Sequence, residues 1–387
     1  MKHEVFWKNP GYKGRPELKQ DIQCDYLIVG GGITGVATAY FLSQMGAKNI
    51  ILIEKNAIAS GATGKAAGSI VLKGELDLKD ILHIYGREKG LRYWRLNEEG
   101  LNVMKKVIRK ERIACDFEEE DTIYGSAYRD TDPSVLSEYI VEKEIEPLSR
   151  LLVGKEMKKE INTPLFTYAL YSKKHGISVN PLQFTQRLSQ KIEKYGVRVY
   201  ENTPLMHLKK RSAITPKGTI NFKEVIVATD SSLRNSKIKK ITSTIIITNP
   251  LTRKQLKSIS MIPKKIIWDS KIIYHYLKIT KDNRILLGYG DKHTHKKHTK
   301  IDPHKPHIIR IRKFLNKLFP HLNVSIEYAW SGSFGVTDNK IPLIERTENH
   351  IMIGGAASQV MCIMAARYLA EKLTGRKSKM EEFFEVE

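Results

Sequence analysis

Residues 25–54 carry the pattern that decides the fold. The apolar run Asp25-Tyr-Leu-Ile-Val29 leads directly into the glycine-rich turn Gly30-Gly-Gly-Ile-Thr-Gly35. A helical stretch, VATAYFLSQMG, comes next, and a second apolar run, Ile50-Ile-Leu-Ile53, ends at the acid Glu54. This order predicts a strand, a tight turn, a helix and a second strand, followed by a carboxylate at its end.

Each part of this unit has a mechanical reason. The first glycine permits the tight turn, the second lets the main chain approach a pyrophosphate, and the third lets the helix lie close to the sheet. Amides at the helix start can then bind phosphates. Glu54 lies 24 positions after Gly30, where an acid accepts hydrogen bonds from an adenosine ribose. Because the whole context agrees, we favour dinucleotide binding over a purely structural turn, with phosphate-site residues Gly30, Gly32, Ile33, Thr34 and Gly35.

Composition describes a globular protein with a basic surface. The chain has 387 residues, with 65 Lys and Arg against 42 Asp and Glu, which gives a net charge of +23. The lysines are spread along the chain, so we do not expect a nucleic-acid partner. Three distant cysteines offer no metal or redox pair. No signal-peptide core is visible, and the apolar stretch 351–366 is interrupted by polar residues, so we expect a cytoplasmic protein without a membrane span.

Two kinds of segment alternate along the rest of the chain. Residues 75–160 are charge-rich and predict helices, and their acidic run 118–121 is expected to be a solvated loop. Residues 176–229 return to an α/β pattern. Alternating runs in 241–290 predict a mostly antiparallel sheet. The end of the chain predicts one more strand, HIMIGG, and a closing helix, VMCIMAARYLAEKL, ended by Gly375.

The fold class that follows is α/β. A Rossmann-like nucleotide-binding domain is expected from the discontinuous segments 1–79, 160–235 and 322–387. A substrate-binding α+β domain with a mostly antiparallel sheet is expected from the inserted segments 80–159 and 236–321.

Several motifs, in this order, point to a known family. They are an early FW, then CDYLIVGGGITG, SGATGKAAGS, GISVNPLQFTQRL, GVRVYENTPLMHL, TPKGTINFKEVIVATD, YHYLKITKDNRILLGYG and WSGSFGVTDNKIPLIER. Together they resemble the D-amino acid oxidase superfamily of FAD-dependent oxidoreductases, which includes glycine and sarcosine oxidases. The last motifs look closest to its γ-glutamylputrescine oxidase-like branch.

The resemblance implies FAD and assigns cofactor contacts. Gly332 lies about where relatives with covalent flavin carry a cysteine, so noncovalent FAD is expected. Lys65 matches a position that is often arginine, where a cation offsets cofactor charge or is simply exposed. The other matching residues are Glu54 and Lys55 at the ribose, Ala62, Thr63, Ala67, Gly68 and Ser69 in the loop beside the flavin, Leu205 at the adenine, and Asp230.

The substrate side departs from the family pattern. Phe334 stands about where amino-acid oxidases carry a carboxylate-binding arginine, which favours an amine or another substrate with a different anchor. Tyr276 and Lys278, on one face of a strand and opposite His275, are the candidate catalytic residues, with sheet packing as the alternative. The helix-start turn reads GGAASQVMC. The larger residues expected beside the flavin there are Gln359, Val360 and Met361.

The expected activity is oxidation of a C–N bond by hydride transfer to flavin N5, with oxygen or another electron acceptor. Two alternatives remain open. One is oxidation of a hydroxy acid or glycerol phosphate, and the other is a degenerate flavin-binding protein with a structural or nucleic-acid-associated role. The His-rich stretch 291–307 lacks a supporting carboxylate or cysteine framework, so no metal site is expected.

Overall fold

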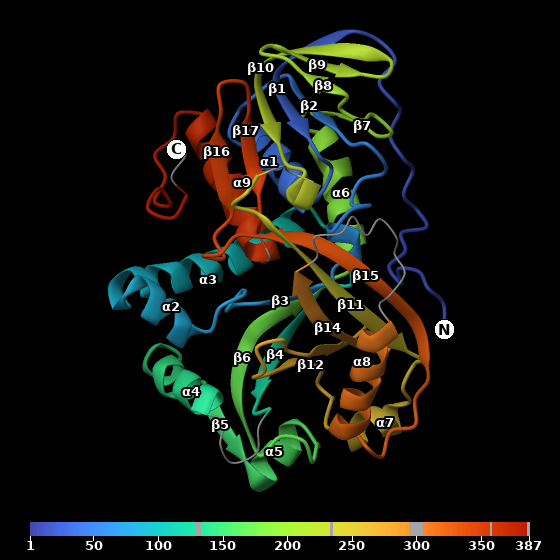
Figure 1. The fold of residues 1–387 in the computed structure, drawn as a ribbon, viewed down its shortest axis with the longest axis vertical. Helices are drawn as coiled ribbons and strands as arrows, with labels where there is room; N and C mark the ends of the chain where they lie inside the picture. Colours follow the sequence, from blue (N-terminus) through green and yellow to red (C-terminus); the bar gives the residue numbers. More distant parts are fainter. Residues whose placement is uncertain (128–132, 233–234, 294–304, 357, 385–387) are drawn as a thin grey trace.

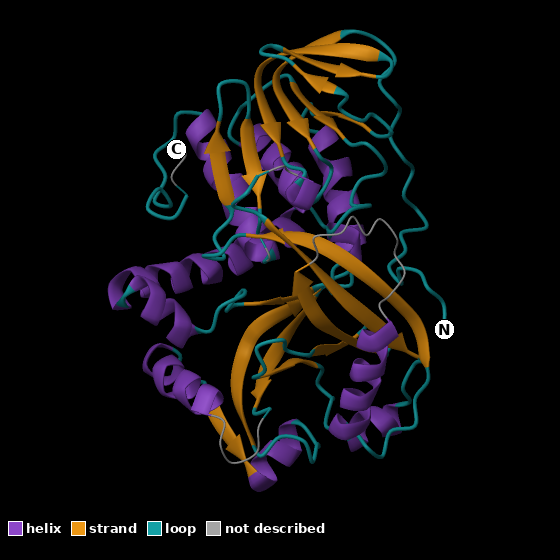
Figure 2. Cartoon of the chain, viewed as in Figure 1, coloured by secondary structure: helices purple, strands orange, loops and turns teal. Residues whose placement is uncertain are grey.

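The computed structural model describes residues 1–127, 133–232, 235–293, 305–356 and 358–384. Within them the chain forms two sheets, one in the upper and one in the lower half of Figure 1, with helices packed around both (Figure 2).

The upper sheet contains the strand–turn–helix–strand unit that the sequence predicts. Its described strands run in the order β16-β17-β10-β1-β2-β7, and β8 and β9 extend it beside β10. The neighbours β17, β10, β1, β2 and β7 are parallel. The bounds are β1 Ile22–Val29, β2 Ile50–Ile53, β7 Arg198–Tyr200, β8 His207–Leu208, β9 Ser212–Thr215, β10 Gly218–Val227, β16 Leu343–Arg346 and β17 Ile351–Gly354.

Strand β1 lies in the middle of this sheet because its apolar residues are buried on both faces. Val29 is paired with Ile53 on β2 and with Val227 on β10. Since the three strands are parallel, their carboxyl ends meet at one edge of the sheet. The glycine turn begins at that edge, which is where α/β sheets bind ligands.

The lower sheet is antiparallel except for the parallel pair β4 and β12. Its described strands run in the order β15-β11-β14-β13-β12-β4-β6-β3, with β5 beside β6. The predicted fold class is therefore confirmed. The bounds are β3 Ser69–Val71, β4 Glu118–Gly125, β5 Arg150–Val153, β6 Tyr168–Ser178, β11 Lys239–Thr248, β12 Lys265–Asp269, β13 Tyr276–Ile279, β14 Ile285–His293 and β15 Ile326–Val336.

One local expectation is wrong. The acidic run 118–121 is not a solvated loop, because it forms the first half of β4, where Glu118, Glu119 and Glu120 pair with β6 and Asp121 pairs with β12. Glu120 is only 3 % exposed. Main-chain pairing with β6 outweighs the tendency of these acids to remain in water, and one of them is buried.

Helices cover both sheets. Helices α1, α6 and α9 pack beside the upper sheet and contribute to one apolar core, and α8 packs on β11 and β14. The helix bounds are α1 Ile33–Gln44, α2 Leu78–Tyr85, α3 Arg87–Lys110, α4 Pro133–Ile145, α5 Gly154–Glu160, α6 Pro181–Glu193, α7 Arg253–Ser258, α8 Lys305–Leu318 and α9 Gln359–Leu373, with single 3-10 turns at Thr63–Lys65 and Asp230–Ser232.

The proposed domain boundaries stay a prediction, and several elements pack across them. Helix α3 lies within the segment assigned to the substrate domain, yet it packs on α9 in the core of the upper sheet. Strands β3, β6 and β15 lie in segments assigned to the nucleotide domain, yet they belong to the lower sheet. The two halves are therefore joined through shared elements as well as through loops.

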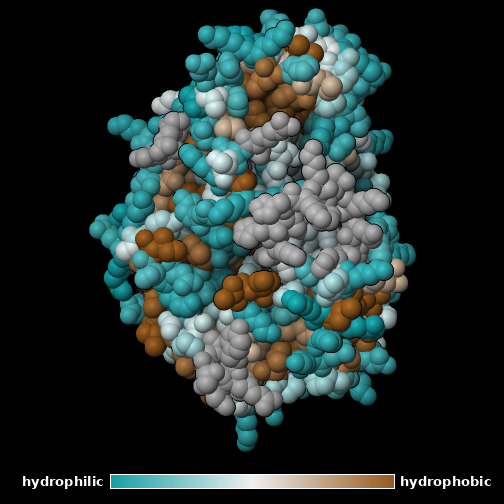
Figure 3. Space-filling model, in the orientation of Figure 1, coloured by the Kyte–Doolittle hydropathy of each residue, from teal (hydrophilic) through white to brown (hydrophobic). Residues whose placement is uncertain are grey.

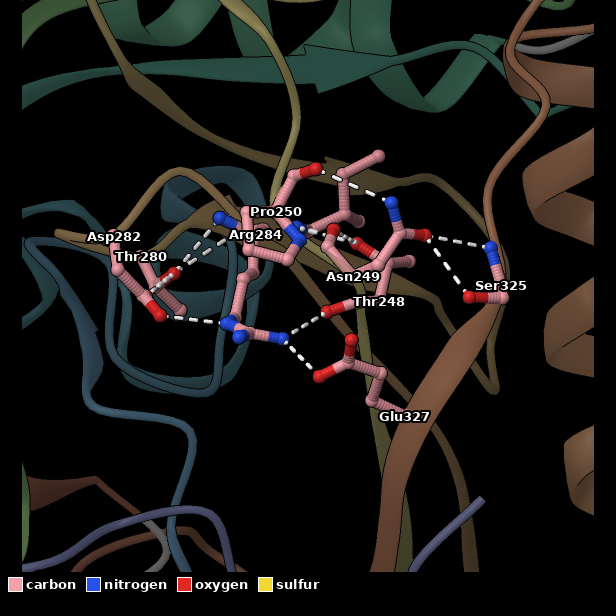
Figure 4. A network of polar contacts seen from close by, with 9 residues as sticks. Thr248, Asn249, Pro250, Thr280, Asp282, Arg284, Ser325 and Glu327 are labelled. Carbon is pink, nitrogen blue, oxygen red and sulfur yellow. Dashed lines mark hydrogen bonds and ion pairs between the residues drawn. The ribbon is translucent and has the colours of Figure 1, made fainter.

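Arg284 holds together one end of the lower sheet (Figure 4). Its Nη1 donates to the carbonyl of Thr248 at 2.9 Å and to the carboxylate of Glu327 at 2.5 Å, while its Nε donates to Asp282 at 2.6 Å. These contacts connect the β13–β14 turn to β11 and β15. Since they use main-chain and neighbouring acidic acceptors, we interpret Arg284 as structural.

The face of the molecule in Figure 3 is mostly hydrophilic, with apolar residues in small separate groups. In the described part of the chain, no helix has an apolar stretch long enough to cross a membrane.

Candidate functional site

A cavity of about 1410 Å³ is lined by residues from both sheets. This volume exceeds the roughly 300–1,000 Å³ of ordinary small-molecule sites. Of the residues predicted from the sequence, the cavity brings together Gly30, Gly32, Ile33, Thr34, Glu54, Lys55, Ala62, Thr63, Ala67, Ser69, Leu205, Asp230, Tyr276 and Gln359. Gly35, Gly68, Lys278, Val360 and Met361 are not among its lining residues.

The glycine turn has the geometry that its spacing predicts. Gly30 has a φ of +116°, and a Cβ there would lie 2.5 Å from the carbonyl oxygen of Ala228. A Cβ on Gly35 would lie 1.9 Å from the carbonyl oxygen of Gly30, so this glycine lets α1 pack against the turn. Gly32 differs, because its Cβ would contact only Thr63 Oγ1, at 3.4 Å, beside the cavity.

The start of α1 faces the cavity. Gly32 occupies its N-cap without a side-chain cap, and Thr63 Oγ1 accepts a hydrogen bond from the Ile33 amide at 3.0 Å. An uncapped helix start with a glycine in front of it suits an anionic group.

Glu54 does more than its sequence position predicts. One carboxylate oxygen accepts from the Gly31 amide at 2.8 Å, and the other accepts from the Asn56 amide at 2.9 Å. The side chain therefore supports the glycine turn while it also lines the cavity. A carboxylate has further lone pairs that can accept hydrogen bonds from ribose hydroxyls.

Residues 60–69, which we call the cofactor loop, are held by three side chains from outside the upper sheet. Trp330 Nε1 donates to the Lys65 carbonyl at 2.9 Å, and Trp7 Nε1 donates to the Ala66 carbonyl at 2.8 Å. Lys278 Nζ donates to the Gly68 carbonyl at 2.9 Å. The sequence motifs contain all three donors, but only the tertiary structure shows what they bind.

Asp230 joins three segments at the cavity wall. It has a φ of +48°, and its carboxylate accepts from the amides of Gly335 at 2.9 Å and Gly355 at 3.4 Å. Burial raises the pKa of this carboxyl, and the three main-chain amides that donate to it oppose the shift. The ends of β10, β15 and β17 are thereby fixed relative to one another.

The start of α9 presents only part of the predicted set. Gln359 lines the cavity, and its Oε1 atom is buried without a hydrogen-bond partner in the described structure. Val360 instead packs toward Gly100 of α3, and Met361 is buried in the apolar core. Burial raises the pKa of the neighbouring Cys362 to about 12, so this cavity-lining thiol stays protonated near neutral pH.

The lower-sheet end of the cavity is aromatic and charged. Lys73 Nζ lies 4.9 Å from the Trp268 ring centroid and 5.7 Å from that of Tyr274, and it donates to Asp77 at 2.6 Å. Tyr274 donates to the Glu75 carboxylate at 3.4 Å. Burial counts against the charged form of Lys73, but Asp77 and other acids raise its pKa overall. The cavity-lining residues at this end are Lys73, Glu75, Trp268, Tyr274 and Tyr276.

Two polar atoms on the wall, besides Gln359 Oε1, are buried without a partner among the described residues. They are Ser69 Oγ and Trp268 Nε1. Other buried polar atoms that lack a partner within the described residues, such as Trp94 Nε1, lie away from the cavity, so these two do not by themselves identify a ligand.

The residues singled out for departures from the family pattern also fall here. Phe334 and Gly332 line the cavity, and a Cβ on Gly332 would lie 3.1 Å from that of Lys65. Burial lowers the pKa of Lys65, and Lys240 and Lys55 lower it further. His275 points away from this wall, as strand alternation predicts, since it pairs with Asp269 at 2.8 Å.

Metal binding gains no support. Within the described ranges, no group of three or more His, Cys, Asp or Glu side chains is placed to hold an ion. Most of the His-rich stretch, residues 294–304, lies outside those ranges.

Comparison with known proteins decides the family. The model of the family described as FAD dependent oxidoreductase matches residues 25–372. The chain belongs to this family. It is 28 % identical over 386 residues to γ-glutamylputrescine oxidoreductase of Escherichia coli, which covers 95 % of this chain and 87 % of that protein.

Solved structures of other enzymes share the fold. Glycine oxidase from Geobacillus kaustophilus superposes with a TM-score of 0.78 at 15 % identity, over 94 % of this chain and 98 % of the other. L-proline dehydrogenase from P. horikoshii superposes with a TM-score of 0.77 at 18 % identity, over 95 % of this chain and 97 % of the other. The family resemblance inferred from the motifs is confirmed, and the protein is an enzyme of this oxidoreductase family.

The residues present fit the FAD that the family implies. The start of α1, with glycine at its N-cap, suits the pyrophosphate, Glu54 suits the ribose, and the unpartnered Gln359 Oε1 belongs to a residue of the same cavity wall. Sequence reasoning missed Trp7, Trp330, Lys73, Glu75 and Trp268. The early FW and the WSG motif contained two of them, but no local pattern pointed to the other three.

Proposed function

We propose that this enzyme oxidises a C–N bond of a small amine or amino-acid-like substrate with noncovalently bound FAD. The observation that most supports this proposal is a single cavity. It runs from the glycine turn to an aromatic end that contains the carboxylate of Glu75. When bound, FAD would supply the hydride acceptor, at flavin N5. The residues described below would bind the cofactor, orient the substrate and shield both from water.

FAD would be held by main-chain and side-chain groups of the upper sheet. The glycine turn and the α1 start would bind the pyrophosphate, with Glu54, Lys55 and Leu205 at the adenosine. The cofactor loop, Asp230 and Gln359 would lie at the flavin. Noncovalent binding is supported by Gly332 and by the protonated Cys362, since a thiol is a weak nucleophile.

The substrate would lie at the aromatic end. Glu75 suits a cationic amine. Asp77 offsets the charge of Lys73, the cation that already lies near the Trp268 and Tyr274 rings. The rings of Trp268, Tyr274 and Tyr276 exclude water from this end. The Trp268 Nε1 donor suits a carbonyl or carboxylate elsewhere on the same substrate. Phe334 offers no carboxylate-binding guanidinium, which supports a substrate anchored differently from a free α-amino acid. The named activity of the Escherichia coli relative is consistent with an amine substrate.

A second candidate is oxidation of an anionic hydroxy acid or glycerol phosphate. It is favoured by Lys65 and Lys240, two cavity-lining cations that repel each other electrostatically. Both candidates use the same cavity and flavin, so a substrate panel separates them.

The experiment is an anaerobic visible spectrum of the FAD-loaded protein before and after each compound is added. The panel contains polyamines, N-methylated amino acids, D- and L-amino acids and hydroxy acids. We expect amines to bleach the flavin. Bleaching by hydroxy acids alone favours the second candidate, and a flavin that only dithionite reduces contradicts both and favours a non-catalytic role.

A further inference from the structure

Lys278 of β13 is buried beside Gly68 and Val179, which continue the antiparallel pair of β3 and β6 by one residue. Its Nζ donates to the Gly68 carbonyl at 2.9 Å and to the Val179 carbonyl at 3.2 Å. The Val179 amide donates to the same Gly68 oxygen at 2.9 Å. Gly68 has a φ of +69°, and a Cβ there would lie 2.1 Å from the Val179 carbonyl oxygen. The two segments are therefore closely packed at this point, and Lys278 donates a hydrogen bond to each of them.

One of the two segments, at Gly68, is part of the cofactor loop. Ala67 and Ser69, on either side of Gly68, both line the cavity. The Trp7 ring centroid lies 5.3 Å from Lys278 Nζ, and the same indole donates to the Ala66 carbonyl. A shift of the ammonium would thus disturb two contacts of the loop, at Ala66 and at Gly68.

Glu120 is the acid that most favours the charged form of Lys278. Strand pairing places it on the same sheet face as Lys278. Glu120 and Thr122 are two residues apart on β4, so they share a face, and Thr122 pairs with Ile266 on β12. The β12–β13 register, in which Ile267 pairs with Leu277, puts Ile266 opposite Lys278. In the described structure Glu120 and Lys278 are not joined by a direct ion pair, and the Ser178 side chain lies close enough to Glu120 to favour its charged form as well. Glu120 therefore acts on Lys278 through its charge.

The surroundings set how these groups titrate. Burial lowers the pKa of Lys278 to about 8, while Glu120, then Glu118 and Asp116, oppose the shift. Burial raises the pKa of Glu120 to about 7, opposed first by Lys278. The other charged or titratable groups acting on this cluster are Lys264, Arg187 and Cys115, the last of which stays protonated because burial raises its pKa to about 12.

We propose that Lys278 is a positioning residue, which fixes the cofactor loop by binding the carbonyls of Gly68 and Val179, and that Glu120 keeps its ammonium charged. This proposal rests on the proposed flavin site and reassigns Lys278 from a substrate-contacting role to one behind the cofactor loop. Lys278 acts through the loop and touches neither cofactor nor substrate.

The test compares Lys278→Met with Lys278→Arg and with a matched control. Lys265 is also a buried lysine of the lower sheet, and it donates to the carbonyls of Ser260 and Pro263, at 3.1 and 3.3 Å, but does not line the cavity. We expect Lys278→Met to raise the FAD dissociation constant about tenfold or more, because a hydrogen bond to a charged group is lost. Lys278→Arg should restore most of the FAD affinity. Lys265→Met should lower thermal stability without changing FAD affinity.

A second measurement does not depend on FAD. Hydrogen–deuterium exchange of peptides covering residues 60–69 in the apoprotein should be faster in Lys278→Met and unchanged in Lys265→Met. If the wild-type protein fails to bind FAD, the proposed function fails, but the exchange measurement still tests whether Lys278 fixes the cofactor loop. Equal exchange and equal FAD affinity in wild type and Lys278→Met would overturn the inference, as would an equal loss of affinity in Lys265→Met.

The pH profile tests the role of Glu120 and does not require Lys278→Met to fold. Since a lysine loses its charge above its pKa, FAD affinity of wild type should fall as the pH rises through about 8. Glu120→Gln removes the largest opposing charge, so the fall should move to lower pH by roughly one unit or more. Identical profiles would contradict the role of Glu120.

Discussion

Trp330 on β15 donates its indole N–H to the main-chain carbonyl of Lys65, at 2.9 Å, across a separation of 265 residues. The donor lies in the lower sheet, and the acceptor lies in the loop that begins beside the nucleotide turn. Trp7 repeats the contact at the adjacent Ala66. The position of the cofactor loop therefore depends on the lower sheet as well as on the strand before it.

Replacing Trp330 with phenylalanine keeps an aromatic ring but removes the donor. A neutral hydrogen bond contributes about 0.5–1.5 kcal/mol, so we expect FAD affinity to fall roughly threefold to tenfold. Trp7→Phe should act similarly, and a double-mutant cycle should reveal coupling because the two acceptors are neighbours. Fluorescence titration of the apoprotein with FAD measures both. Unchanged affinity in the folded double variant would contradict this account of the loop.

Gly32→Ala separates cofactor binding from folding. A methyl group at this position would contact only Thr63 Oγ1 in the protein, but it would enter the space assigned to the pyrophosphate. We expect a change in unfolding free energy of about 1 kcal/mol or less and a loss of FAD affinity of tenfold or more. Gly11→Ala is the control, since a Cβ there has no neighbour within 4 Å and Gly11 does not line the cavity. Equal FAD affinity in the two variants would place the pyrophosphate elsewhere.

Glu138 of α4 makes stability depend on pH. It accepts hydrogen bonds from the amides of Leu78 and Lys79 at the start of α2. Burial, and then Asp77, raise its pKa from the ordinary 4.5 to about 8. The folded protein therefore holds a proton that the unfolded chain releases between these values. This contribution to stability is full below about 4.5 and is lost as the pH rises through about 8.

We expect the Glu138→Gln variant to lose less unfolding free energy than wild type between pH 5 and pH 8. Urea denaturation at several pH values measures the slope. Glu144→Gln is the matched control on the same helix, because Glu144 is exposed and pairs with Arg87 at the surface. Its slope should equal that of wild type. Parallel slopes for all three proteins would show that Glu138 is ionised in the folded state.

Glu75→Gln should affect the substrate and leave the cofactor in place. Removal of the carboxylate at the aromatic end should raise the half-saturating amine concentration about tenfold, since a contact to a charged group is lost. FAD affinity should stay within about twofold of wild type. Anaerobic flavin reduction at varied amine concentration gives the first quantity, and titration gives the second. A loss of FAD affinity without a change in amine saturation would put Glu75 at the flavin.

Local patterns predicted the nucleotide end well. The turn from Gly30 to Gly35 and the acid at Glu54 belong to one short strand–turn–helix–strand unit, and the spacing within that unit placed them, although Gly30 also packs against Ala228. The family motifs likewise placed Thr63, Leu205 and Asp230 on the cavity wall. These residues belong to short segments whose conformation depends mainly on adjacent strands.

The substrate end depends on contacts between distant segments, and local patterns predicted it poorly. Glu120 looked solvated because it sits in an acidic run, yet pairing of β4 with β6 carries it into the core. Lys278 shares a strand face with Tyr276, as predicted, but its ammonium binds carbonyls of other segments. Lys73, Glu75 and Trp268 come together only through the sheet order, which no single segment encodes.

The central claim is that one cavity holds the flavin and an amine together. Anaerobic reduction of the FAD-loaded wild-type protein, followed by flavin absorbance as amine is added, tests it most directly. The account predicts one FAD per chain and complete bleaching at a rate that saturates with amine concentration. A fully loaded protein that stays oxidised with every amine, while dithionite still reduces it, would contradict the claim.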